Sequence, residues 1–179
     1  MKYTDEAYKE AIAVVVSDIH YSNASYTSKI ANIRRYSEII IRRLLGYDTD
    51  KQLTLGHYVT QDKLRKKGFT EKLLIDAIAS INEEGSDRTH TQVIPVATKE
   101  EYENAVSSLF DLYAYLFVDY FKRNPFGSNP DIMRAFSILP AEIRHTALLC
   151  LYELNPTNID IVDKLVLAMV KARGLEAAE

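Results

Sequence analysis

Residues 82–90 read Asn-Glu-Glu-Gly-Ser-Asp-Arg-Thr-His and hold the densest group of polar side chains in the sequence. They end a segment, 70–82, whose apolar residues recur at helical spacing. The best partner for this segment is residues 30–45, Ile-Ala-Asn-Ile-Arg-Arg-Tyr-Ser-Glu-Ile-Ile-Ile-Arg-Arg-Leu-Leu. Amphipathic helices bury their apolar stripes against one another. The two segments therefore predict a helical bundle, with a polar pocket built from Arg35, Glu38 and His90.

Helical spacing extends over most of the chain on both sides of this pair. We predict helices over residues 5–21, 25–45, 53–68, 70–82, 98–122, 131–138, 140–154 and 158–173. Local signals mark several of their ends. Gly46 is placed to stop the second helix, Thr70 to cap the fourth, and Thr98 with Glu101 forms a capping box for the longest. No strand is needed to account for the apolar pattern, so we predict an all-α protein.

The segment Asn-Pro-Phe-Gly-Ser-Asn-Pro at 124–130 is the clearest interruption of the helical pattern. We place a domain boundary there, with an up-and-down helical bundle over 1–125 and a helical C-terminal extension over 126–179. The extension is rich in apolar residues, so we expect it to pack on the bundle. These residues are Leu148, Leu149, Leu151, Leu154, Ile161, Leu165 and Val166.

Composition places the chain among globular proteins. Of its 179 residues 47% are hydrophobic and 26% are charged, and no apolar run is long enough to span a membrane. No signal peptide is recognisable, and the single cysteine, Cys150, cannot form an internal disulfide. We therefore expect a cytoplasmic protein with no membrane partner. The net charge of −3 argues against a constitutive nucleic-acid binder, although two basic segments stand out, at 29–43 and 63–67.

Known motifs for nucleotide, metal or nucleophile chemistry are absent from the sequence. It contains no GxxxxGK[ST], GxGxxG, HExxH or CxxC pattern. Its histidines, at positions 20, 57, 90 and 145, do not have metal-ligand spacing. We expect no metal site and no cofactor.

Two short patterns resemble the HEPN-type helical domains. Arg35-Tyr36-Ser37-Glu38 is similar to the Arg-Ala-Leu-Glu pattern of an uncharacterised branch, and residues 85–90 to its Gly-Asn-x-Ala-Ala-His pattern. The capped acidic helix start at 98–101 is also similar, so the resemblance covers roughly residues 5–123. It implies a HEPN-like bundle, a homodimer, and a role in a bacterial or mobile-element defence or regulatory system.

Catalytic members of that superfamily cleave RNA without metal through an Arg-(x)4–6-His motif. There the histidine transfers a proton and the arginine holds the scissile phosphate. His90 is the residue that matches the catalytic histidine, but neither Gly85, five residues before it, nor Asn82, eight residues before it, is an arginine. Arg88 is only two residues from His90 and would point to another side of a helix.

The first interpretation is therefore a binding module with little or no enzymatic activity, which takes RNA, a ligand or a protein. Its expected binding residues are Arg34, Arg35, Glu38, Ser86, Asp87 and Arg88. Two alternatives stay open. One is a metal-independent endoribonuclease that uses His90 with a displaced arginine. The other is a scaffold whose protein partner binds the C-terminal helices.

Overall fold

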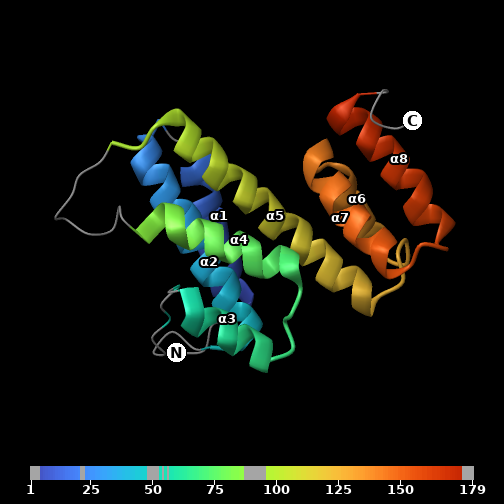
Figure 1. The fold of residues 1–179 in the computed structure, drawn as a ribbon, viewed down its shortest axis with the longest axis horizontal. Coiled ribbons are helices and arrows are strands. Elements are labelled where there is room, and N and C mark those ends of the chain that lie inside the picture. Colours follow the sequence, from blue (N-terminus) through green and yellow to red (C-terminus); the bar gives the residue numbers. More distant parts are fainter. Residues whose placement is uncertain are drawn as a thin grey trace. The chain divides into compact units, whose positions relative to one another are not determined.

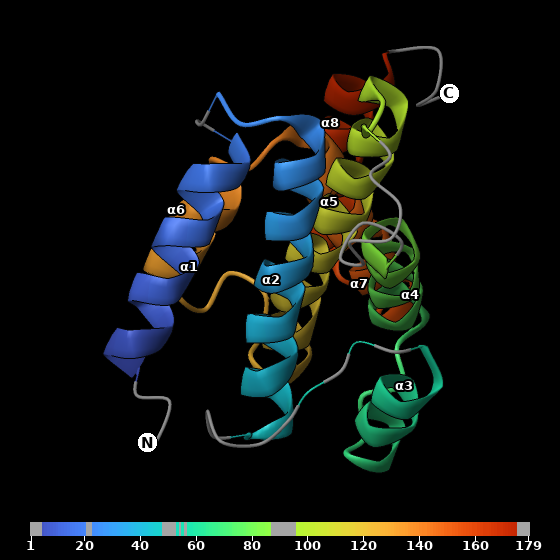
Figure 2. The same cartoon turned by 90° about the vertical axis from the view of Figure 1, so that its left-hand side faces the viewer.

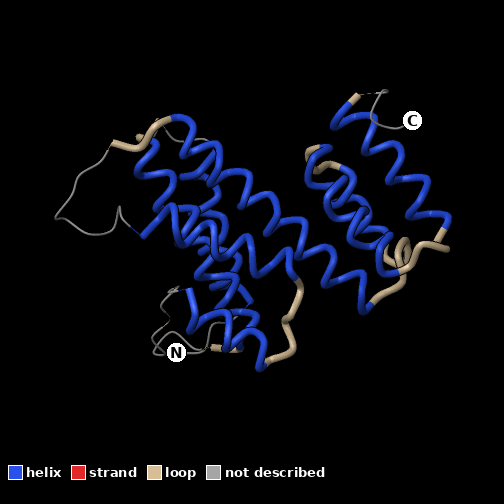
Figure 3. Tube along the Cα trace, in the orientation of Figure 1, coloured by secondary structure: helices blue, strands red, loops and turns tan. Residues whose placement is uncertain are grey.

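The computed structural model describes residues 5–20, 23–47, 53, 55, 57–86 and 96–174. Within these residues all regular structure is helical, and no strand is present (Figure 3). The predicted all-α class is confirmed. None of the helices in the described ranges is both long and apolar enough to cross a bilayer.

Figure 1 shows the helices in chain order. Their bounds are α1 Asp5–His20, α2 Tyr26–Leu45, α3 His57–Lys66, α4 Lys72–Ser86, α5 Lys99–Arg123, α6 Pro130–Ser137, α7 Ala141–Leu154 and α8 Ile159–Arg173. Several predicted ends were wrong. The third helix begins at His57, not at residue 53, and ends at Lys66. The fourth helix begins at Lys72, and its first bond runs from the Ile75 N–H to the carbonyl of Glu71, not of Thr70. It continues to Ser86, past residue 82.

The chain divides into two compact units, residues 1–109 and 110–179. The boundary falls inside α5, and not at the 125/126 junction that the sequence predicts. The reason lies in the second half of α5, whose Phe117 and Phe121 rings pack against Phe136 of α6 at centroid distances of 5.2 and 5.8 Å. Packing of residues 126–179 on the bundle stays a prediction.

In the first unit, α2 is the central helix and packs against α1, α3 and α4 (Figure 2). Its fully buried isoleucines, Ile33 and Ile41, lie two helical turns apart on its apolar stripe. The Ser37 hydroxyl between them donates to the Ile33 carbonyl at 3.1 Å, which satisfies a buried polar group locally. Gly46 ends α2 in the left-handed conformation at φ 65°, as predicted.

The start of α5 is fixed to the start of α2. The Thr27 hydroxyl accepts a bond from the Ala97 N–H at 3.0 Å, and the Tyr26 and Tyr102 rings stack with centroids 5.2 Å apart. The predicted capping box is confirmed. The Thr98 N–H donates to Glu101 Oε2 at 2.7 Å, and the Glu101 N–H donates to Thr98 Oγ1 at 3.2 Å.

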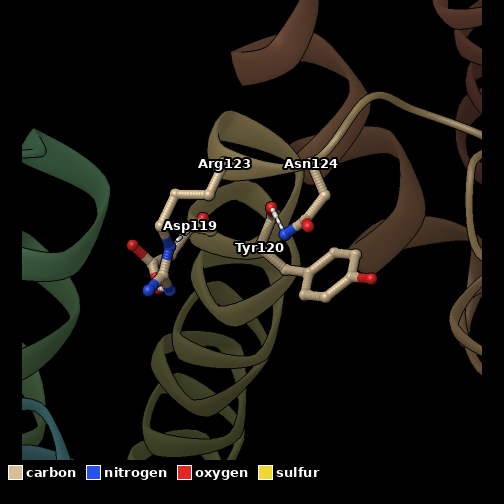
Figure 4. Close-up of polar contacts among 4 residues, drawn as sticks. All are labelled: Asp119, Tyr120, Arg123 and Asn124. Atoms are coloured by element: carbon tan, nitrogen blue, oxygen red, sulfur yellow. Dashed lines mark hydrogen bonds and ion pairs between the residues drawn. The ribbon is translucent and has the colours of Figure 1, made fainter.

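The other end of α5 has side-chain contacts that cover its last carbonyls (Figure 4). Asn124 donates through Nδ2 to the Tyr120 carbonyl at 2.9 Å, and Arg123 donates through Nε to the Asp119 carbonyl at 3.1 Å. The Arg123 guanidinium also pairs with the Asp119 carboxylate. Because the Tyr120 carbonyl also accepts from the Asn124 N–H at 3.0 Å, these side chains add second bonds to carbonyls near the end of the helix. The helix ends at Arg123, within one residue of the predicted end.

The second unit has an aromatic cluster and a helical hairpin. The cluster consists of Phe117, Phe121, Phe126 and Phe136, with Phe121 and Phe126 centroids 4.8 Å apart. The hairpin is α7 and α8, which pack along each other after a short connection capped by Asn158. Such a connection makes the two helices antiparallel.

Candidate functional site

Arg34 of α2 passes directly under Gly85 of α4. A Cβ built on Gly85 would stand 2.9 Å from Arg34 Cδ, closer than real carbon contacts allow. Gly85 keeps a helical backbone, so it is required for this close approach and not for a positive φ.

The partner of Glu38 is Arg34, with Nε and Oε1 3.6 Å apart. The predicted pairing of Glu38 with Arg35 was wrong. Arg35 is exposed and donates to Asn32 Oδ1 at 3.4 Å. Residues four apart share a helix face, whereas Arg35 is rotated by about 100° from Arg34. We name Arg34, Glu38 and Gly85 the arginine junction.

The arginine junction has one unusual polar atom. The Arg34 side chain is 15% exposed, and its Nη1 is buried without a hydrogen-bond partner among the described residues. A buried guanidinium nitrogen of this kind is costly, because its water has been removed and not replaced. The Arg34 side chain thus closes the space between α2 and α4, and its charge is partly balanced by Glu38.

The rest of the predicted site is not described. Ser86 closes α4, but its side chain lies outside the described residues, as do Asp87, Arg88 and His90 entirely. The structure therefore brings together Arg34, Glu38 and Gly85, and separates Arg35 from them.

Several cations of the two basic segments already have partners within the chain. Lys29 lies 5.5 Å from the Tyr102 ring centroid, Lys63 lies 5.8 Å from that of Tyr47, and Lys66 pairs with Asp62 at 2.6 Å. These contacts are typical of solvated helix faces, where each contributes little.

A cavity of about 480 Å³ lies in the second unit among α6, α7 and α8. Its apolar walls are Pro130, Met133, Phe136, Leu148 and Leu167. Its polar lining consists of Arg134, Ser137, Arg144, Lys164 and Lys171. We name these residues together the cationic pocket. Its volume lies within the range of about 300–1,000 Å³ that is usual for small-molecule sites.

Four positive charges and no carboxylate line this pocket. Arg134 is 79% exposed and has Asp131 at 3.9 Å, whereas Arg144 is half-buried. Among the residues that the structure describes, neither Lys164 nor Lys171 has a carboxylate within 4 Å. These cations produce a positive potential, which water screens in part because Arg134, Lys164 and Lys171 are exposed. The pocket therefore favours an anion.

Arg144 is the best oriented of these cations. Its Nε donates to the Leu139 carbonyl at 3.0 Å, in the connection between α6 and α7. This bond leaves the two terminal nitrogens of the guanidinium for a ligand. A guanidinium held in this way loses less side-chain entropy when it binds an anion.

Each helix contributes its pocket residues from one face. Lys164, Leu167 and Lys171 follow the i, i+3, i+7 spacing on α8, and Arg144 and Leu148 are four apart on α7. From the sequence alone, this region is expected to pack through its leucines or to bind a protein partner, and no anion site is predicted in it. The signal that could have found the pocket is the presence of cations within apolar helix stripes.

Metal-binding chemistry has no support in the described ranges, which contain no group of three or more His, Cys, Asp or Glu side chains arranged to hold an ion. Comparison of the chain with family models, with curated proteins and with solved structures gives no match. The resemblance to HEPN-type domains thus stays an expectation, and the geometry of the two sites is what supports a function.

Proposed function

We propose that this chain is a non-enzymatic binding module, and that the cationic pocket is its binding site. The ligand is an anion that carries an apolar group. One observation carries the proposal: four cations and no carboxylate surround a cavity with five apolar residues in its walls. Burial of apolar surface would supply most of the affinity, and the cations would supply selection for negative charge.

The experiment uses an anionic apolar fluorophore, anilinonaphthalene sulfonate, titrated into the full chain. We expect saturable binding at one site. The double variant Arg144→Gln with Lys171→Gln should weaken binding by about tenfold for each lost charge-assisted contact.

The matched control is Arg65→Gln with Lys67→Gln. It removes the same charge from two exposed residues of the first unit. Equal loss of affinity in both double variants would overturn the proposal, because net charge alone would then explain binding. Melting curves establish that each variant is folded.

The family resemblance supplies the wider context of this proposal. We infer a HEPN-like, homodimeric and cytoplasmic protein of a bacterial or mobile-element defence or regulatory system, on the strength of the patterns at 35–38 and 85–90. Sedimentation at tens of micromolar protein tests the dimer. A single species of 20.4 kDa would contradict it.

The ribonuclease alternative needs an arginine beside His90. Arg34 contacts Gly85 near the end of α4, whereas Arg35 is exposed and bonds to Asn32, so Arg34 is the better candidate of these two for the displaced arginine. Incubation of RNA with wild type, Arg34→Gln and His90→Ala in EDTA tests this alternative. Cleavage by wild type that both variants abolish would favour the enzyme over the binding module.

A further inference from the structure

The four cations of the pocket are not spread evenly along it. On α7, Arg144 lies four residues before Leu148, and on α8, Lys171 lies four residues after Leu167. Because α7 and α8 run antiparallel, these steps lead in the same direction in space. Arg144 and Lys171 therefore stand at one end of the pocket, one helical turn beyond the two leucines.

An electrostatic effect agrees with this register. Burial lowers the pKa of His145, the residue after Arg144, and the positive charge of Arg173 near the end of α8 lowers it further. The beginning of α7 is thus beside the end of α8. Lys164 stands two turns before Lys171 on α8, about 10 Å away, at the opposite end.

Helix α7 begins at Ala141, three residues before Arg144, and Glu142 in its first turn offsets the partial positive charge of the first-turn amides. The positive charge at this end of the pocket therefore comes from the side chains of Arg144 and Lys171, while Leu148 and Leu167 continue away from it.

We propose that the cationic pocket takes a single-chain anionic amphiphile, a linear alkyl chain with one carboxylate or phosphate head. The head binds between Arg144 and Lys171, and the chain lies over Leu148 and Leu167. This assignment rests on the proposed binding function and names its ligand class.

The other cations fit this placement. Arg134 has Asp131 beside it, so it has less need of a ligand anion. Lys164 can lay its methylene stem along the alkyl chain and keep its ammonium in water.

Calorimetric titration of the full chain with monomeric octanoate, decanoate and dodecanoate tests the proposal. Affinity should rise about fourfold for each methylene that enters the pocket. Decanol, decyl trimethylammonium and acetate should each bind at least tenfold more weakly than decanoate, because each lacks the charge or the chain. A comparison of the affinities of decyl phosphate and decanoate identifies the preferred head group.

Pocket variants locate the two parts of the ligand. Lys171→Gln should weaken decanoate binding about tenfold, and Lys164→Gln by less than threefold. Leu167→Asn should reduce the gain per methylene, whereas Val166→Asn, its exposed neighbour outside the pocket, should not. Both substitutions are at exposed positions, so the fold is kept.

The outcomes separate the two proposals. Equal losses of decanoate affinity in Lys164→Gln and Lys171→Gln would overturn the amphiphile proposal, and so would an affinity that does not depend on chain length. If the fluorophore still binds in that case, the proposed binding function stands. Binding of an acidic amphipathic peptide alone would also overturn the ligand class. Failure of fluorophore and alkanoates together would overturn both.

Discussion

Arg34 Cδ occupies the space that a side chain at residue 85 would need, and Gly85 is the residue that leaves it open. Glycine in a helix costs roughly 0.5–1 kcal/mol relative to alanine. The contact with Arg34 therefore explains why a glycine, and not an alanine, stands at this position of α4. Arg34 has little freedom to move aside, because it is 15% exposed and paired with Glu38.

The substitution Gly85→Ala should therefore lower the free energy of unfolding by about 1 kcal/mol, since overpacking exceeds the gain in helix propensity. In an Arg34→Ala background the same substitution should be neutral or stabilising. Urea denaturation of the four proteins in this double-mutant cycle measures the coupling. Equal effects of Gly85→Ala in both backgrounds would disprove the steric explanation.

The stability of the protein should decrease as the pH falls below about 6.5. Burial, and secondly the charge of Arg173, lower the pKa of His145 from its usual 6.5, so the unfolded chain binds a proton first. The side chain is 5% exposed, and its Nε2 has no hydrogen-bond partner among the described residues. A proton that binds to the unfolded chain but not to the folded one stabilises the unfolded state, and so lowers the free energy of unfolding.

Urea denaturation of wild type and His145→Gln at pH 7.5 and 5.5 checks this expectation. The variant should lose less stability between the two pH values. His20→Gln is a useful comparison, because the pKa of His20 is also lowered, by burial and then by Lys29, although the residue is more exposed. If His145→Gln loses as much stability between pH 7.5 and pH 5.5 as wild type does, His145 is not the source of the pH dependence.

The capping box at the start of α5 should contribute about 1 kcal/mol to stability. Thr98→Ala removes the oxygen that accepts the Glu101 N–H, and leaves one first-turn amide without its partner. Thr98→Ser keeps that oxygen and serves as the control. Thermal unfolding compares the three proteins, and a serine variant as unstable as the alanine variant would refute the capping role.

Cys150 should react slowly with thiol reagents in the native protein. Burial raises the pKa of its thiol, and the carboxylates of Glu153 and Asp111 raise it further. Only the thiolate is an effective nucleophile. Labelling at pH 8 should be several-fold faster in urea than in buffer. Glu153→Gln should accelerate the native reaction, and no change in that variant would remove Glu153 as a cause.

Local signals in the sequence were sufficient for most of the fold. Thr98 and Glu101 are three residues apart. At the start of α6, Asn129 Oδ1 accepts bonds from the N–H groups of Asp131 and Ile132, so chemistry within one turn decides both helix ends. The C-terminal leucines were predicted less well. Leu148, Leu151 and Leu165 are buried as expected, but Leu149 and Leu154 are exposed.

The sites depend on relations between helices, which a single sequence does not contain. Whether Arg34 or Arg35 meets α4 is decided by the rotation of α2 in its packing, and the two residues are adjacent in sequence. The cationic pocket needs Arg144 and Lys171 to converge from two helices. Neither residue is distinctive in its own segment.

Phe136 forms part of the pocket wall and also contacts three other phenylalanine rings. Phe126, in the turn that follows α5, lies at a centroid distance of 6.1 Å from Phe136, so a ligand that displaces Phe136 should change the surroundings of the Phe126 ring. Aromatic proton resonances of Phe117, Phe121 and Phe126, residues that do not line the pocket, therefore serve as built-in reporters of ligand binding.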